Sequence, residues 1–230
     1  MDVGVNPFPI TFAVHFLGIT AIAMVLVWTI HYLGGLAWNS PDKSLLFNVH
    51  PVLMLIGLVV IGGEAIISYK SFPLEKEVKK VIHLVLHAIA LVLGIVGIYA
   101  VFLFHNEKHI ANLYSFHSWI GIAAIVLYGV QWIYGFVMFM YPGGDPALRR
   151  VSLPWHILFG LLVYMMVVAA AILGFLEKMT FLEESGLAKF GSEAYLVNFT
   201  SVVTVLFAAL VVFCAITKPP APAFDDYAPI

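Results

Sequence analysis

The chain has 230 residues, of which 62% are apolar and only 10% charged, with a net charge of −2 and a mean hydropathy of +1.01. Because a soluble domain carries about 25% charged residues, this composition excludes a water-soluble globular protein and predicts one in a lipid bilayer. The only cysteine, Cys214, lies in an apolar run, so neither an internal disulfide nor a thiolate metal cluster is expected. No nucleic-acid partner is expected either.

Six apolar segments follow one another along the chain, each long enough to cross a hydrocarbon core of about 30 Å. The first follows MDVGVNPFPI, which lacks the basic stretch of a signal peptide, so an uncleaved span is expected. Ten-residue alternating strands of a barrel are not visible, so the fold class is an all-α membrane protein. The six predicted transmembrane helices lie near 10–33, 48–69, 79–104, 116–140, 154–176 and 195–217.

Polar breaks separate these spans, and their lysines and arginines predict the orientation. The second and fourth breaks, the start of the third span at Lys79 and Lys80, and the tail together hold 7 of the 11 basic residues, and the other three breaks hold 4. The positive-inside rule therefore places both termini in the cytoplasm. The tail at 218–230 is rich in proline and is predicted to be disordered. The breaks are expected at 38–47, 70–78, 105–115, 141–153 and 177–194.

Four histidines stand near the starts of four consecutive predicted spans, namely His50, His83, His117 and His156. Successive antiparallel helices begin on alternate sides of the membrane. The second and fourth spans therefore bring His50 and His117 near the outer face. The third and fifth spans bring His83 and His156 near the cytoplasmic face. The sequence thus predicts two histidine pairs, one near each surface.

Paired neutral imidazoles on facing helices suit a haem iron with both axial positions filled, which favours electron transfer over oxygen chemistry. The alternative is that each histidine only hydrogen-bonds a neighbouring helix, although intramembrane histidines are rare and usually functional. A zinc site is disfavoured, because two pairs at opposite faces do not gather four ligands. Glycines on the same helices would let a flat macrocycle approach the backbone: Gly57, Gly62, Gly63, Gly94, Gly97, Gly121, Gly129, Gly135 and Gly160.

The remaining histidines are less informative. His87 lies four residues after His83, on the same helix face, and is the rival ligand. Depth favours His83, with His87 packing or hydrogen-bonding beside it. His15 and His31 lie in the first span, outside the four-helix set, and receive no role. His109, in the outer loop, is read as a solvated surface histidine.

Several motifs at matching spacing resemble the cytochrome b561 family: FNVHP (47–51), EAIISYK (64–70), KKVIHLVLH (79–87), NLYSFHSW (112–119), QWIYGF (131–136), YPGG (141–144) and PWH (154–156). The resemblance covers spans two to five with their loops. It implies a single domain over 1–230 with a haem-binding core at about 46–178. It further implies a six-helix homodimer with two haem b per chain, in which spans two to five form a four-helix bundle around the haems.

The resemblance carries specific residues with it. It implies axial ligands at His50, His83, His117 and His156, which are the pairs argued above. SYK resembles the motif whose basic residue, here Lys70, lies against a haem edge. NLYS and LEK resemble the residues around the outer haem: Asn112, Leu113, Tyr114, Ser115 and Glu177. The family motif often reads ALLVYR where this chain has AIISYK, and lysine offers a point charge instead of the planar fork of arginine.

The function implied by the resemblance is electron transfer from cytoplasmic ascorbate to monodehydroascorbate or ferric chelates on the other side. The enzyme would be an ascorbate-dependent transmembrane oxidoreductase, multi-pass in an endomembrane of vacuolar type or in the plasma membrane. Ascorbate is an anion, so its site is expected at the basic residues that begin spans three and five. His105, in the outer loop, is the expected contact of the acceptor. The basic residues are Lys76, Lys79, Lys80, Arg149 and Arg150.

Two other functions stay open at this point. A proton or metal-ion transporter could also line its path with membrane histidines and Glu64. Against a transporter, the sequence shows no broken helices and no chain of acidic residues apart from Glu64. The other alternative is a structural membrane subunit that holds haem only for stability. A basic loop can also be a topology signal alone.

Overall fold

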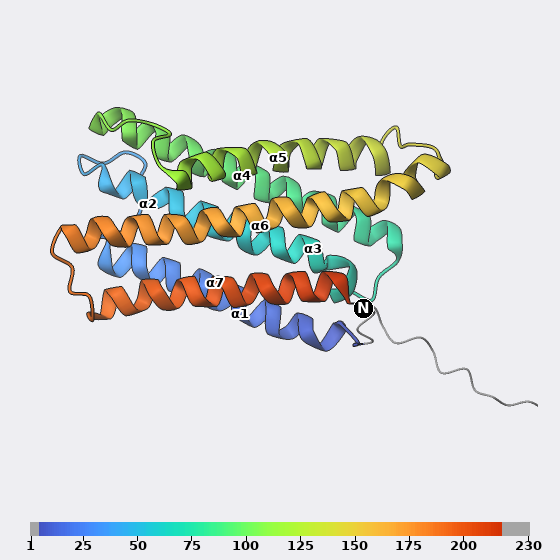
Figure 1. The fold of residues 1–230 in the computed structure, drawn as a ribbon, viewed down its shortest axis with the longest axis horizontal. Helices are drawn as coiled ribbons and strands as arrows, with labels where there is room; N and C mark the ends of the chain where they lie inside the picture. Colours follow the sequence, from blue (N-terminus) through green and yellow to red (C-terminus); the bar gives the residue numbers. More distant parts are fainter. Residues whose placement is uncertain (1–4, 218–230) are drawn as a thin grey trace, which may run out of the picture.

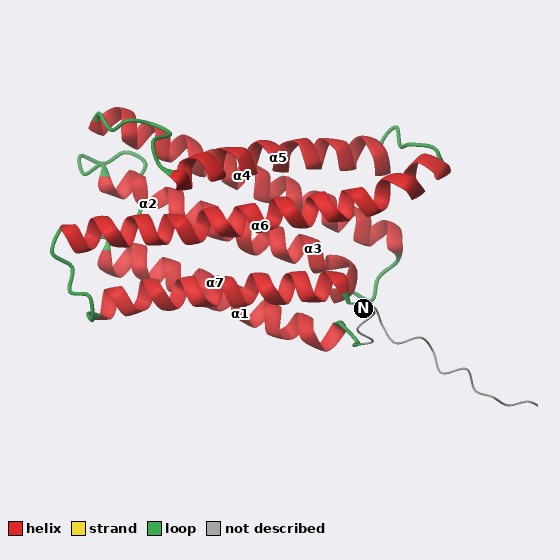
Figure 2. Cartoon of the chain, viewed as in Figure 1, coloured by secondary structure: helices red, strands yellow, loops and turns green. Residues whose placement is uncertain are grey.

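The structure, a computed structural model, describes residues 5–217, so the predicted disorder of the tail at 218–230 lies outside the described residues. Long helices run antiparallel to one another in a single bundle (Figure 1). Among residues 5–217 there is no strand (Figure 2). By length and composition, 6 helices can cross a membrane. The prediction of six transmembrane helices is therefore confirmed.

The spans follow the predicted order. The first is α1 (Phe8–Val27) with the π-helical turn η1 (Trp28–Tyr32), and the second is α2 (Ser44–Leu53), η2 (Met54–Ile61) and α3 (Gly62–Ser71) in one continuous helix. The other four spans are α4 (Lys76–Lys108), α5 (Phe116–Phe139), α6 (Pro146–Glu184) and α7 (Ser192–Ile216).

The predicted ends of the fifth span are wrong. α6 has 39 residues and takes in much of both polar breaks, 141–153 and 177–194. Its start is fixed by Asp145, whose carboxylate accepts from the backbone N–H of Leu148 at 2.9 Å, and by Pro146 in the first turn. A helix of about 20 residues already crosses the hydrocarbon core, so both ends of α6 extend beyond it. Hydropathy finds only the apolar middle of such a helix.

The second span changes its winding beside one of the predicted haem ligands. Pro51 lies inside this helix, directly after His50, and has no N–H for the carbonyl of Phe47. The helix then widens to π-helical winding over Met54–Ile61 before it returns to α-helix at Gly62. Wide turns of this kind occur often at functional sites, because they re-aim side chains without breaking the helix. The span stays continuous.

The four spans that carry the paired histidines lie together, and α1 and α7 pack against each other beside them (Figure 1). Large side chains fill the interface between these two helices and the four other spans. Among them are Trp28, Tyr164 and Phe207, each no more than 1% exposed. The outer surface is apolar as well, with Phe16 69% and Trp119 65% exposed. Such a surface suits lipid, and the bundle interior is left for polar groups.

Candidate functional site

Two cavities lie inside the bundle, one toward each end. The basic end is the end that holds the start of α4 and the start of α6, and the far end is the opposite one. The far-end cavity has a volume of about 310 Å³ and is lined by His50 and His117. The basic-end cavity has a volume of about 700 Å³ and is lined by His83 and His156. The structure therefore brings together the two pairs that the sequence predicts.

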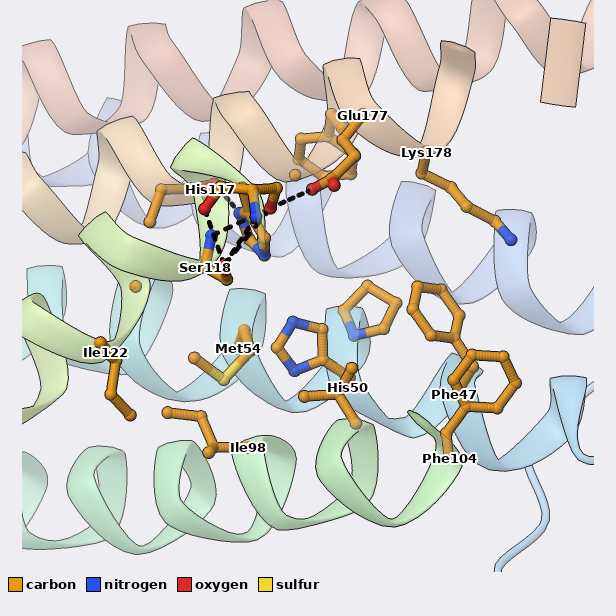
Figure 3. Close-up of a pocket in the computed structure, with 18 of the residues that line it drawn as sticks. Phe47, His50, Met54, Ile98, Phe104, His117, Ser118, Ile122, Glu177 and Lys178 are labelled. Atoms are coloured by element: carbon orange, nitrogen blue, oxygen red, sulfur yellow. Dashed lines mark hydrogen bonds between the residues drawn. The ribbon is translucent and has the colours of Figure 1, made fainter. Parts of the chain in front are cut away.

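At the far end, His50 on the second span and His117 on α5 point into the cavity from opposite sides (Figure 3). Their ring centres are 6.1 Å apart. Nδ1 of His50 lies 3.0 Å from the carbonyl oxygen of Gly97, and Nδ1 of His117 lies 2.8 Å from that of Ala170. A carbonyl only accepts, so both Nδ1 atoms carry the proton, and each Nε2 keeps a free lone pair.

At the basic end, the ring centres of His83 and His156 are 6.3 Å apart. Nδ1 of His83 lies 2.8 Å from the carbonyl oxygen of Ala65. The fourth histidine differs, because Nδ1 of His156 lies 3.0 Å from the side-chain amide of Gln131. Three of the four imidazoles are therefore oriented by backbone carbonyls and one by a side chain.

Both separations fit two imidazoles on one metal ion. A metal–nitrogen bond of about 2.0 Å and about 1.1 Å from that nitrogen to the ring centre, on each side, place the two centres roughly 6.2 Å apart. Within residues 5–217, no three His, Cys, Asp or Glu side chains converge to hold a metal ion. The pairs thus have the chemistry and spacing for a haem iron held axially by two protein ligands.

His87 lies at the edge of the basic-end cavity. Its ring is edge-on to that of His83, with centres 4.4 Å apart. Its Nδ1 is hydrogen-bonded to the hydroxyl of Tyr128. His83 faces His156 at a ring spacing of 6.3 Å, which suits two ligands of one iron. The hydrogen bond at Nδ1 does not distinguish the two histidines, because His83 has one as well. The geometry supports the preference for His83.

The predicted strip from Asn112 to Ser115 lines the far-end cavity together with Glu177. The hydroxyl of Ser115 donates to the Glu177 carboxylate at 3.2 Å and also caps α5 by accepting from the backbone N–H of Ser118. Leu113 has a φ of 55°, a left-handed conformation that a leucine rarely adopts. Burial, and then the charge of Glu177, raise the pKa of Tyr114.

His105 also lines the far-end cavity, at its outer edge. Its Nδ1 lies 3.1 Å from Oδ1 of Asn112, and Nδ2 of Asn112 donates to Oδ1 of Asn106 at 3.0 Å. The structure therefore ties the predicted acceptor contact to the strip that lines the cavity. For His15, which the sequence left without a role, Nδ1 lies 2.8 Å from the carboxylate of Glu64 on α3.

Four of the five predicted ascorbate contacts line the basic-end cavity: Lys76, Lys80, Arg149 and Arg150. The fifth, Lys79, is not among the lining residues and donates to the backbone carbonyl of Tyr69 at 3.4 Å. Within the described part of the chain, buried Nε of Arg149 has no hydrogen-bond partner. A buried, unpaired guanidinium N–H is costly unless an anion meets it, so this atom suits an anionic substrate.

Lys70 also lines the basic-end cavity, as the resemblance implies. Its Nζ donates to the backbone carbonyl of Thr217 at 3.0 Å, where α7 ends. The lysine thus connects the second span to α7 at the rim of the cavity.

Most of the expected glycines do not face the cavities but let helices pack closely. A Cβ on Gly57 would lie 2.7 Å from Leu93, and one on Gly94 would lie 3.0 Å from Leu58. Only Gly135 faces a paired histidine, with 2.9 Å between its added Cβ and Cε1 of His156. Sequence reasoning missed its counterpart Gly174, whose Cβ would lie 2.8 Å from Cε1 of His117.

Residues that line the two cavities contact each other inside the bundle. Val59 lines the far-end cavity and Tyr164 lines the basic-end cavity. The hydroxyl of Tyr164 donates to the carbonyl of Val59 at 3.2 Å. The linings of the two cavities are therefore in direct contact at this hydrogen bond.

Comparisons with known proteins agree with this geometry. The family of eukaryotic cytochrome b561 matches residues 49–182. The chain is 61% identical over 215 residues to transmembrane ascorbate ferrireductase 1 of Arabidopsis thaliana, which covers 94% of this chain and 90% of the relative.

Two further relatives come from rice and pig. The chain is 57% identical to the probable ascorbate-specific transmembrane electron transporter 1 of Oryza sativa subsp. japonica, over 100% of this chain and 99% of the relative. It is 39% identical to the transmembrane ascorbate-dependent reductase CYB561 of Sus scrofa, over 91% of this chain and 82% of the relative. By the extent of these matches and by its own motifs, this chain belongs to the cytochrome b561 family.

Proposed function

We propose that this protein is an ascorbate-dependent oxidoreductase that carries electrons across a membrane. It takes them from ascorbate at the basic end, which faces the cytoplasm, through two haem b groups. It delivers them to monodehydroascorbate or a ferric chelate at the far end. Family membership and the names of the relatives support the donor and the transmembrane path.

The observation that carries the proposal is the pair of opposed imidazoles in each cavity. Their ring centres are 6.1 Å and 6.3 Å apart, and one pair lies toward each end of the same bundle. His50 and His117 would hold one haem, and His83 and His156 the other. A haem with both axial positions filled exchanges one electron and offers no open position to oxygen.

The chain's own residues keep the ligands ready. The carbonyls of Gly97, Ala65 and Ala170 hold Nδ1–H of three histidines, so each Nε2 faces its cavity without a proton. These hydrogen bonds would hold the three rings in place when a haem is bound. The apolar walls exclude water, and the contact between Tyr164 and Val59 keeps the two sites close.

At the basic end, cations surround the mouth of the cavity and attract the ascorbate anion. Arg149 offers the unpaired Nε, and Lys76 and Arg150 line the same cavity. Lys80 is already ion-paired with Glu77, so its charge is partly satisfied. Arg149 is therefore the residue with most to gain from an anion.

The position of the Arg149 side chain also depends on Gly143, in the loop before α6. Gly143 has a φ of 83°, and a Cβ there would collide with the guanidinium of Arg149. The loop before α6 thus needs glycine both for its backbone conformation and for the place of this arginine.

The test is electron transfer into closed vesicles. Proteoliposomes are loaded with ferricyanide and receive ascorbate outside. Molecules with the basic end outward should reduce the trapped acceptor, and a membrane potential should change the rate, since each charge moved is worth about 2.3 kcal/mol per 100 mV. No reduction of the trapped acceptor would contradict the proposal.

The ligands are tested in the same preparation. His50→Ala and His117→Ala should lose one haem, His83→Ala and His156→Ala should lose the other, and each variant should stop electron entry into the vesicles. His87→Ala is the matched control and should keep both haems. Haem per chain is measured by the pyridine haemochrome method, and two haems retained in any ligand variant would refute the assignment.

A further inference from the structure

One of the four paired histidines is held differently from the other three. Nδ1 of His156 faces no backbone carbonyl and lies 3.0 Å from Nε2 of Gln131, a side chain on α5. We infer that Gln131 is a positioning residue for His156 and that it sets the reduction potential of the haem at the basic end. The inference rests on the haem sites of the proposed function.

Gln131 makes two contacts with the same residue. Its Nε2 donates to the backbone carbonyl of His156 at 2.7 Å, in addition to facing the ring. Because a carbonyl oxygen only accepts, the amide atom at this position is the nitrogen and not the oxygen. The amide therefore presents a donor to Nδ1, where the rings of the other three histidines meet an acceptor. Accepting this N–H leaves the proton of a neutral His156 ring on Nε2, so before Nε2 could bind a haem iron that proton would have to move to Nδ1, where no acceptor in the described part of the chain meets it.

Two glycines make room for this arrangement. A Cβ on Gly160, one turn after His156 on α6, would lie 3.2 Å from Nε2 of Gln131. A Cβ on Gly135, one turn after Gln131 on α5, would lie 2.9 Å from Cε1 of His156. α5 and α6 pack against each other extensively. The amide and the ring are thus confined between two helices, and neither can turn alone.

The arrangement changes how strongly the ring donates electrons to iron. An imidazole whose second N–H donates to an oxygen is a more basic ligand. Among residues 5–217, Nδ1 of His156 has the Gln131 amide nitrogen as its hydrogen-bond partner and no oxygen. As an iron ligand, His156 would therefore donate electrons most weakly of the four histidines, and a haem bound at the basic end would be the more easily reduced one. It is also the haem that ascorbate meets first in the proposed direction.

Gln131→Glu tests this directly, because a carboxyl oxygen accepts Nδ1–H of His156. The potential of the basic-end haem should fall by about 59 mV or more, a tenfold change in its reduction equilibrium. The far-end haem should keep its potential. Both are read from a spectroelectrochemical titration. Unchanged potentials, or equal shifts of both haems, would overturn the inference.

Gln131→Met keeps the length of the side chain and removes both hydrogen bonds. It should change the low-spin ferric EPR signal of the basic-end haem, since the ring of His156 is then free to turn. The matched control is Asn198→Leu, which removes an amide-to-carbonyl bond of 2.8 Å on α7. The control should leave both EPR signals as they are.

The two methods separate this inference from the proposed function. If His156→Ala keeps two haems, the assignment of the ligands is wrong. If the parent and both Gln131 variants hold two haems and neither potentials nor EPR signals differ, the ligands stand and only the role of Gln131 is refuted. If Gln131→Glu does not fold, Gln131→Met alone decides.

Discussion

Gly174 on α6 faces the ring of His117, and adding one methyl group there should weaken the far-end haem site selectively. The new Cβ in Gly174→Ala would lie 2.8 Å from Cε1 of His117, whereas ordinary contact begins at 3.4 Å. The ring would have to retreat by about 0.6 Å, the difference between these distances, and Nδ1 is bonded to Ala170 on the same helix. Overpacking of this kind costs about 1–3 kcal/mol.

If this free energy weakens only haem binding, haem affinity falls by roughly five-fold to 150-fold. The rate of haem transfer to excess apomyoglobin measures this loss, and absorbance difference spectra identify which haem leaves. Gly135→Ala is the mirror experiment, because its Cβ would lie 2.9 Å from Cε1 of His156. It should release the basic-end haem first.

Gly129→Ala on α5 is the control, since nothing lies within 4 Å of its added Cβ. In a helix this change stabilises by up to about 1 kcal/mol and should leave both haems in place. Equal haem loss in Gly174→Ala and Gly129→Ala, or no loss in Gly174→Ala, would show that the ring of His117 is not held as described.

Two more predictions concern the ends of the electron path. Arg149→Ala should raise the KM for ascorbate about tenfold, the effect of losing roughly 1.4 kcal/mol of anion binding, with both haems retained. Salt should also slow reduction by ascorbate in the parent, because exposed charges are screened over about 8–10 Å; an unchanged KM in the variant would make the basic residues a topology signal only. His105→Ala should leave both haems and their reduction by ascorbate intact but slow reoxidation by an external acceptor, since it removes the hydrogen-bonding group next to Asn112. Stopped-flow absorbance follows both half-reactions, and normal reoxidation would exclude His105 from the acceptor site.

Span number and histidine pairing could be read from the sequence, because each depends on information local to one segment. A run of apolar residues long enough for the bilayer is a helix wherever it packs. The alternation of helix direction then decides which histidines share a face. His50 with His117 and His83 with His156 follow from these two facts, and the structure has the same pairs.

The ends of the helices were predicted poorly, because hydropathy does not detect them. A hydropathy pattern identifies the residues that are apolar enough to lie in the hydrocarbon core, whereas a helix ends where its last backbone groups are capped. α6 begins at the cap formed by Asp145 and continues to Glu184, through polar stretches that a hydropathy pattern predicts as loops. Caps and turns beyond the hydrocarbon core leave only a weak mark in composition.

Only the tertiary structure decided which groups orient the histidine rings in each site. The carbonyls of Gly97, Ala65 and Ala170 reach the histidines from other helices, and Gln131 replaces a carbonyl at His156. Which glycine meets a ring depends on the rotation of each helix about its axis. That rotation is set by the packing of all six spans together, since lipid gives an apolar helix no preferred side. The sequence determined which residues meet at each end of the bundle, and only the packed bundle decided which atoms orient them.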